Sequence, residues 1–348
     1  MAQRNGLIEY FRFFAAVGIA SYHFEWVYVG QADRLQHFYI LVEFFFVLSG
    51  FFLAQNCIHK DESAMRYVWR QCCKLYPLYF FAFCCSFVVA HLSWQIGWKD
   101  VLEHLWSAKW EVLLCTIFAF DDAPVYNAGG AASYIPALLL ASLILYYLLK
   151  EYRALFNNVL GPLMVVCGLS RIIHVNGNLS VWQQYDGFVT LGIVRACADM
   201  SIGILAAQYL LPVVQKRMGK GGLVAVCGIL FSLLWMVLLV CGRTAISYSD
   251  LILYVFIFAW LLCCASCITL PSALNKIGNM LGKFSYSIFL LHYPILLLLK
   301  QFCGNLSYST ALMLLLFCIM AAGGLITWIT SAIATYKNAK ALNEKAGR

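Results

Sequence analysis

Ten long apolar runs constrain this 348-residue chain more than any other feature. A bilayer core takes about 20 apolar residues per helix. On that criterion the runs predict spans at 7–29, 37–56, 75–93, 132–149, 156–174, 188–211, 222–241, 251–270, 284–300 and 307–334. The connections leave no room for a separate soluble domain. We therefore expect an all-α membrane protein, a polytopic bundle of about ten transmembrane helices, with a membrane domain at 1–336 and a short basic tail at 337–348.

Composition excludes the main alternatives to a membrane bundle. Apolar residues make up 63% of the chain and charged residues only 11%, whereas soluble domains carry about 25% charged residues. So apolar a chain is neither a soluble globule nor disordered. Most of the 15 cysteines lie inside apolar runs, where cysteine behaves as a small apolar residue. We therefore expect neither a disulfide framework nor a metal site.

The basic residues predict the orientation of the bundle. If the N-terminus is cytoplasmic, sixteen of the 24 Lys and Arg residues fall in inner loops and five in outer loops, as the positive-inside rule requires. Segment 101–119 mixes charges with Trp and Leu and suits a helix lying in the interface. An even number of spans then puts both termini in the cytoplasm. Topology accounts for the net charge of +8, and we expect a multi-pass plasma-membrane protein that contacts lipid and no nucleic acid.

Ionisable residues inside the spans are the first candidates for function, because they are costly in a bilayer. Arg12 and His23 lie eleven residues apart, about three turns, and so project from nearly the same helix face. Glu43 in the second span lies at the same depth as His23. We expect the two to pair, either as an oriented general base or as a charge-neutralising pair without chemistry.

Arg195 and Asp199 form a second intramembrane candidate. Their i,i+4 spacing allows the two side chains to neutralise each other on one helix face. A structural ion pair and a substrate contact are equally compatible with that spacing. Arg171 lies near the outer end of its span and can extend its charged end to the interface.

A cationic stripe precedes the third span on the inner side. Arg66, Arg70 and Lys74 recur at every fourth position of a predicted helix. Such a stripe either anchors the protein to lipid head groups or binds the phosphates of a nucleotide-bearing ligand.

Four segments taken in order resemble the acyltransferase-3 family of integral membrane acyltransferases. They are IEYFRFFAAVGIASYHF at 8–24, VEFFFVLSGFFLA at 42–54, YVWRQCCKLYPLYF at 67–80 and LGKFSYSIFLLHYPI at 281–295. Two departures stand out. Lys74 occupies a position where the family usually has Arg, and Ser133-Tyr134 stand where a Trp is common.

The resemblance implies a membrane O-acyltransferase, most simply an O-acetyltransferase, that transfers groups other than amino-acyl groups. Its donor would be a cytoplasmic acyl-CoA, most simply acetyl-CoA, and no metal would take part. Arg12, Arg66, Arg70 and Lys74 would bind the donor. His23 would act as general base or acyl carrier, with Glu43 orienting it. His292, Ser285, Tyr286, Arg195 and Asp199 are further polar candidates for substrate binding. The acceptor would be a hydroxyl of a surface polysaccharide, glycolipid or cell-wall precursor.

Two rival functions remain open from the sequence alone. A transporter or flippase could use His23, Glu43, Arg195 and Asp199 as a polar pathway. A lipid-binding scaffold would need no chemistry at all. Transporters commonly contain paired repeats with broken helices, and the sequence contains no convincing internal repeat.

Overall fold

The computed structural model describes residues 5–32, 34–59, 62–94, 98–118, 125–126, 131–181, 184–218, 222–241 and 248–346. The bundle begins with α1 (Gly6–Phe24) and η1 (Glu25–Val29), then η2 (Phe38–Ile40), α2 (Leu41–His59), α3 (Ala64–Trp94) and α6 (Ala131–Glu151). It continues with α7 (Arg153–Leu155), η3 (Phe156–Leu160), α8 (Gly161–Asn176), α9 (Leu191–Leu205), η4 (Ala206–Leu210) and α10 (Leu211–Met218). It ends with α11 (Leu223–Cys241), α12 (Tyr248–Ser266), α13 (Ser272–Cys303) and α14 (Tyr308–Ala346).

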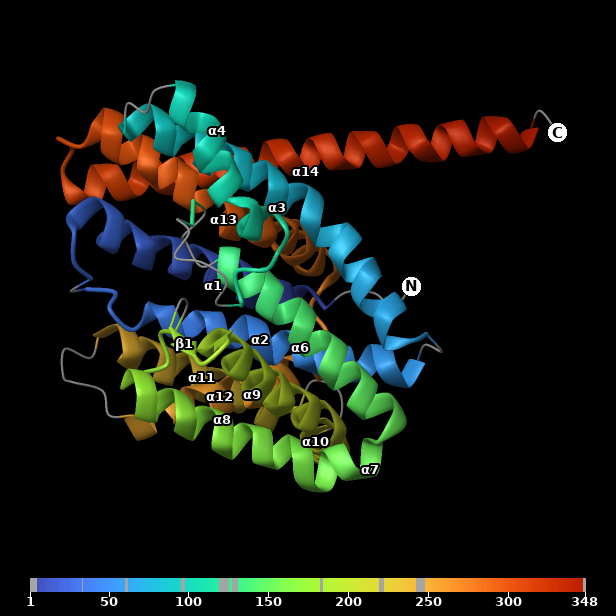
Figure 1. The fold of residues 1–348 in the computed structure, drawn as a ribbon. Coiled ribbons are helices and arrows are strands. Elements are labelled where there is room, and N and C mark those ends of the chain that lie inside the picture. Colours follow the sequence, from blue (N-terminus) through green and yellow to red (C-terminus); the bar gives the residue numbers. More distant parts are fainter. Residues whose placement is uncertain are drawn as a thin grey trace.

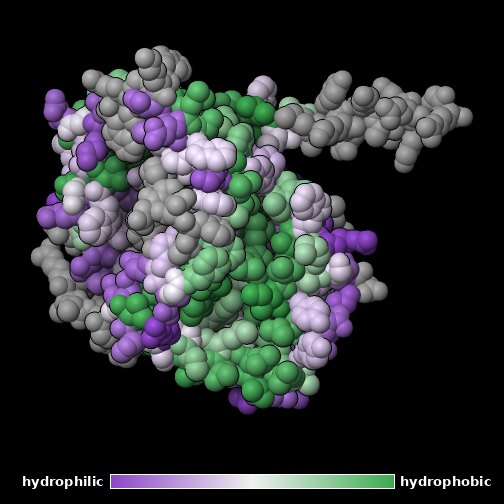
Figure 2. Space-filling view, in the orientation of Figure 1, coloured by the Kyte–Doolittle hydropathy of each residue, from purple (hydrophilic) through white to green (hydrophobic). Residues whose placement is uncertain are grey.

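This architecture confirms the predicted all-α membrane bundle. Among the described residues, seven helices are long and apolar enough to cross a membrane, and α11 and α12 contribute shorter apolar helices. The predicted count of about ten is therefore approximate. The start of α1 and the C-terminal end of α14 lie toward the same end of the bundle (Figure 1), as the predicted even number of crossings requires. Hydrophobic side chains gather over the middle of the face shown in Figure 2, where a bilayer core would contact them.

The segment expected to lie in the interface is not a span. It folds into two short helices, α4 (Trp98–Ser107) and α5 (Lys109–Val112), and neither has the roughly 20 residues that a crossing requires. Nearby, a hairpin of β1 (Tyr185–Asp186) and β2 (Val189–Thr190) pairs Tyr185 with Thr190. The Arg171 side chain donates two hydrogen bonds to Asp186, and these bonds lower the pKa of that carboxyl group below its usual value.

Helix α1 is fixed at its start by side-chain amides. The Asn5 side chain accepts hydrogen bonds from the backbone of Leu7 and Ile8 and so caps the helix. Its amide nitrogen donates to the carbonyl oxygen of Ala265 at 2.8 Å, and Gly6 N donates to the side chain of Asn275. These bonds tie α1 to α12 and α13. The contact between α1 and α13 is the most extensive of any helix pair in the described structure.

Glycines set the second major contact, between α2 and α9. A Cβ atom added to Gly50 would lie 2.0 Å from the carbonyl oxygen of Met200, and one added to Gly203 would lie 2.0 Å from that of Val47. Only glycine permits backbones to approach so closely.

Helix α14 is the least embedded of the predicted spans. Only 17% of its apolar window is buried, compared with 61% for α2. The helix continues through the residues expected to form the basic tail and projects from the bundle (Figure 1).

Candidate active site

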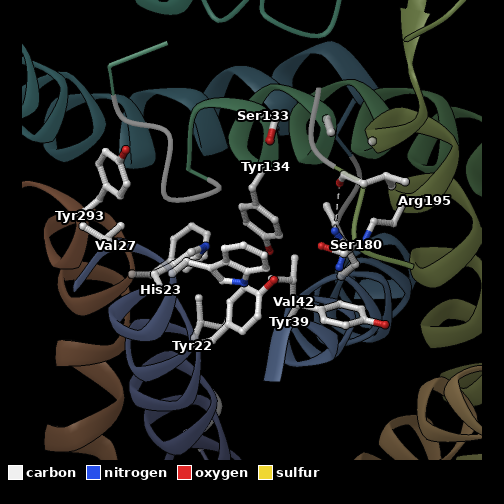
Figure 3. A pocket seen from close by; sticks show the side chains of 17 residues that line it. Tyr22, His23, Val27, Tyr39, Val42, Ser133, Tyr134, Ser180, Arg195 and Tyr293 are labelled. Carbon is white, nitrogen blue, oxygen red and sulfur yellow. Dashed lines mark hydrogen bonds between the residues drawn. The ribbon is translucent and has the colours of Figure 1, made fainter. Parts of the chain in front are cut away.

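A cavity of about 410 Å³ lies between the C-terminal half of α1, the N-terminal halves of α2, α6 and α9, and the middle of α13. Apolar and aromatic side chains form most of its wall, and a few polar groups converge on it, as in typical small-molecule sites. The lining residues are Ile19, Tyr22, His23, Trp26, Val27, Tyr39, Val42, Phe46, Ser133, Tyr134, Ala137, Ser180, Val181, Gly192, Arg195, Phe289 and Tyr293. In Figure 3, His23 and Arg195 lie on opposite sides of the view, and Tyr134 enters between them from α6.

Two histidines form a hydrogen-bonded pair beside this cavity. Nε2 of His292 lies 2.9 Å from Nδ1 of His23, and the two rings are stacked with an interplanar angle of 18°. His292 is fully buried and does not line the cavity, whereas His23 does. The structure thus brings together two sequence-predicted candidates from α1 and α13.

The hydrogen bonds of this pair determine where its protons lie. Nδ1 of His292 is 3.1 Å from the carbonyl oxygen of Ile288, and a carbonyl can only accept. In the neutral pair, Nδ1 of His292 therefore carries a proton and its Nε2 accepts one from Nδ1 of His23. The remaining nitrogen of His23, Nε2, is left with a free lone pair, which is the form that a general base requires.

The expected pairing of Glu43 with His23 is wrong. Glu43 Oε2 accepts a hydrogen bond of 2.7 Å from Nε of Arg195, and Oε1 lies 2.6 Å from Nη2 of the same guanidinium. The expectation rested only on the equal depth of the two residues in the membrane. Glu43 lies on α2, which packs mainly against α9, and its side chain faces α9 and not α1. Glu43 therefore holds the Arg195 side chain at the cavity wall and does not orient His23.

The predicted Arg195–Asp199 ion pair is also replaced by this contact. The Arg195 guanidinium bonds to Glu43 and to the carbonyl oxygen of Val181, while Asp199 lies fully buried in the same cluster. Of the three residues, only Arg195 lines the cavity. Two carboxyl groups and one guanidinium are buried together, and a proton on one carboxyl group makes the cluster neutral, as burial favours.

Arg12 lies outside the cavity that contains His23. Its Nη1 donates to both carboxylate oxygens of Glu9 at 3.1 and 2.9 Å. Within the described structure its Nε is buried without a hydrogen-bond partner, although 26% of the side chain is exposed. Arg12 thus keeps unused donor capacity at Nε, and it does not line the cavity that contains His23.

The polar candidates Ser285 and Tyr286 do not line the cavity. The Ser285 hydroxyl is buried and donates to the carbonyl oxygen of Gly282 at 2.8 Å. Tyr286 donates from its hydroxyl to the carbonyl oxygen of Leu75 at 2.7 Å, which joins α13 to α3. The Ser285 bond lies within α13 and the Tyr286 bond joins two helices, so both hydroxyl groups are engaged away from His23.

The cationic stripe lies on an exposed face of α3. Arg66, Arg70 and Lys74 are all exposed. Arg70 forms an ion pair with Glu62, and Tyr67 behind the stripe stacks on Tyr146 of α6, with ring centroids 4.6 Å apart. The buried tyrosine pair therefore fixes the helix with its basic side chains outward.

The family comparison decides the class of protein. A family model described as an acyltransferase domain, acyltransferase 3, matches residues 5–332. The chain belongs to the acyltransferase-3 family. The protein is accordingly a multi-pass membrane acyltransferase that transfers groups other than amino-acyl groups. No curated protein and no solved structure matches the chain.

Sequence reasoning missed most of the wall of this acyltransferase-3 cavity. Tyr22, Trp26, Tyr39 and Tyr293 carry hydroxyl or indole N–H groups to it, yet aromatic residues are so frequent in these spans that none stands out. Tyr134 was marked only as a departure from the family pattern. Among the described residues, no three His, Cys, Asp or Glu side chains are arranged to hold a metal ion.

Proposed function

We propose that this acyltransferase moves an acyl group, most simply acetyl, from cytoplasmic acyl-CoA to a hydroxyl of a carbohydrate acceptor, and that His23 is its general base. The observation that carries the proposal is the His23–His292 hydrogen bond, because it leaves Nε2 of His23 unprotonated at a cavity wall. A positioned base of this kind supplies about 10²- to 10⁴-fold in rate.

The reaction needs two proton transfers, one from the acceptor hydroxyl to His23 and one from His23 to the departing thiolate. The acceptor hydroxyl gives its proton to Nε2 of His23 while its oxygen attacks the thioester carbonyl carbon. The tetrahedral intermediate then collapses with cleavage of the carbon–sulfur bond. The imidazolium returns the proton to the departing CoA thiolate. His292 accepts the hydrogen bond from Nδ1 of His23 throughout and stabilises the imidazolium as it forms.

The donor is proposed to bind from the cytoplasmic side. Arg66, Arg70 and Lys74 form an exposed basic face suited to the phosphates of coenzyme A. Arg12, deeper in the bundle, has a buried guanidinium N–H without a hydrogen-bond partner among the described residues, and a pantetheine carbonyl or a phosphate oxygen would satisfy it.

The acceptor is proposed to enter at the outer mouth of the cavity. Trp26 is 52% exposed there, and Tyr22, Tyr39 and Tyr293 add aromatic faces with hydroxyl groups. Such side chains combine an apolar body with a polar tip, which suits a sugar ring carrying several hydroxyls. A surface polysaccharide, a glycolipid or a cell-wall precursor in the plasma membrane meets this description.

The test is transfer of labelled acetyl from acetyl-CoA to a carbohydrate fraction by purified protein. We expect transfer by the wild type and a loss of at least about 100-fold in His23→Ala, by the range for general bases. His174→Ala is the matched control, because His174 is exposed on α8 and does not line the cavity. Unchanged transfer in His23→Ala would reject the base assignment. Absence of acyl-CoA binding by the wild type would reject the donor.

A further inference from the structure

Three aromatic side chains pack against one another in the wall of the His23 cavity. Tyr134 lies with its ring centroid 4.5 Å from that of Phe46 and 5.1 Å from that of Phe289. The three residues come from α6, α2 and α13, all line the cavity, and each is no more than 9% exposed. The layer therefore joins three helices at a single level of the bundle.

Tyr134 extends from this layer toward the donor side. Its ring lines the cavity, while its hydroxyl lies beside Ser49 and within electrostatic reach of Arg12 and Tyr286. Arg12 and Tyr286 do not line the cavity. Tyr134 is thus the residue that connects the wall around His23 with the polar groups below it.

A donor held on the cytoplasmic side must bring its thioester past this layer to reach His23. Phe46 and Phe289 each contact a further side chain. The ring centroids of Phe45 and Phe289 are 5.9 Å apart, and Cζ of Arg195 lies 6.0 Å from the ring centroid of Phe46. Tyr134 is held differently, because it stands in the first turn of α6 with its hydroxyl in the polar region. Of the three rings, Tyr134 is therefore the one that reaches from the cavity wall to the polar group of Ser49.

We propose that Tyr134 determines the largest acyl group that this enzyme transfers, because its ring occupies the passage between the donor side and His23. The inference rests on the proposed acyl-CoA chemistry and adds a residue that selects among acyl donors. Tyr134 is a specificity-determining residue here and takes no part in proton transfer.

The test compares acyl-CoA donors of two, four, six and eight carbons with variants that change ring size. In Tyr134→Ala we expect kcat/KM for the six- and eight-carbon donors to rise at least about tenfold relative to acetyl, since a single methylene in a fitted pocket already changes discrimination by about 10- to 200-fold. Tyr134→Trp should act in the opposite direction and restrict transfer to acetyl. Tyr134→Phe keeps the ring and should keep the wild-type profile.

Tyr254→Ala is the matched control, since Tyr254 is a buried tyrosine on α12 whose hydroxyl donates to the carbonyl oxygen of Trp235 and which does not line the cavity. We expect no change of donor profile in it. If Tyr134→Ala does not fold, as judged by gel filtration in detergent, Tyr134→Leu and Tyr134→Trp carry the comparison.

The outcomes separate this inference from the proposed function. A wild-type enzyme that transfers acetyl, with an unchanged donor profile in both the smaller and the larger variant, would overturn the role of Tyr134 alone. A wild type that transfers no acyl group from any of the four donors would overturn the proposed function, and the role of Tyr134 with it. A shift in Tyr254→Ala equal to that in Tyr134→Ala would also reject the assignment.

Discussion

His23 and His292 are 269 residues apart in the chain, yet their imidazole nitrogens lie 2.9 Å from each other. The first is placed by α1 and the second by α13, the two helices with the most extensive contact in the described bundle. The contact makes His292 a positioning residue for the proposed base.

The first prediction concerns that positioning role. Loss of the acceptor in His292→Leu should lower kcat by about 10- to 100-fold, a part of what a positioned base supplies, and leave KM for acetyl-CoA unchanged. In His292→Gln the side-chain oxygen can still accept from Nδ1 of His23, so most of kcat should return. Steady-state kinetics of both variants checks this, and equal loss in the two would contradict it.

The second prediction concerns the buried pair of Glu43 and Arg195. Removing one partner, as in Glu43→Leu, takes away the two close carboxylate contacts of the buried Arg195 guanidinium and should lower the free energy of unfolding by about 3–5 kcal/mol. Replacing both, as Glu43→Leu with Arg195→Met, should cost much less than the sum of the single changes. Thermal unfolding in detergent measures this, and simple additivity would show that the pair is not coupled.

The third prediction concerns the glycines between α2 and α9. Gly50→Ala and Gly203→Ala would each place a methyl group 2.0 Å from a carbonyl oxygen of the facing helix. Overpacking of this kind costs about 1–3 kcal/mol or more. Because this contact also brings Glu43 to Arg195, folded yield should fall in both variants. Gly324→Ala on α14 is the control, since nothing lies within 4 Å of its added methyl group, and an equal loss there would exclude a packing cause.

The fourth prediction concerns the cationic stripe on α3. A charged hydrogen bond contributes about 1.5–3 kcal/mol when well formed, and less when exposed. Arg66→Ala and Arg70→Ala should therefore weaken coenzyme A binding about three- to tenfold, and the loss should shrink at high salt. Isothermal titration with coenzyme A provides the measurement.

The matched control for the stripe is Arg217→Ala, because Arg217 is exposed near the end of α10, away from α3. It should bind coenzyme A as the wild type does. Equal weakening in this control would mean that bulk positive charge, and not the stripe, attracts the donor. Unchanged affinity in the stripe variants would leave the stripe as a topological anchor.

Much of the candidate site follows from local sequence. His23, Arg195 and His292 stand out because ionisable residues are rare in apolar helices, and the structure brings all three to one region around the cavity. The aromatic wall could not be found in this way, because Tyr22, Tyr39 and Tyr134 resemble many other aromatic residues in the spans.

The sequence by itself determined the helical class, the approximate set of spans and the side on which basic residues collect. These properties depend on the composition of each segment, since an isolated apolar run already satisfies its backbone hydrogen bonds as a helix. Family membership likewise resides in motifs that a linear comparison can match.

Only the tertiary structure decided which residues are partners. Depth along a helix is fixed by residue number, and on that measure Glu43 was a reasonable partner for His23. Which neighbour a side chain faces depends on how helices pair and how each is rotated about its axis. Gly50 and Gly203 set this arrangement between α2 and α9, and the Asn5 hydrogen bonds help to set it for α1. Helix packing therefore pairs Glu43 with Arg195 and His292 with His23.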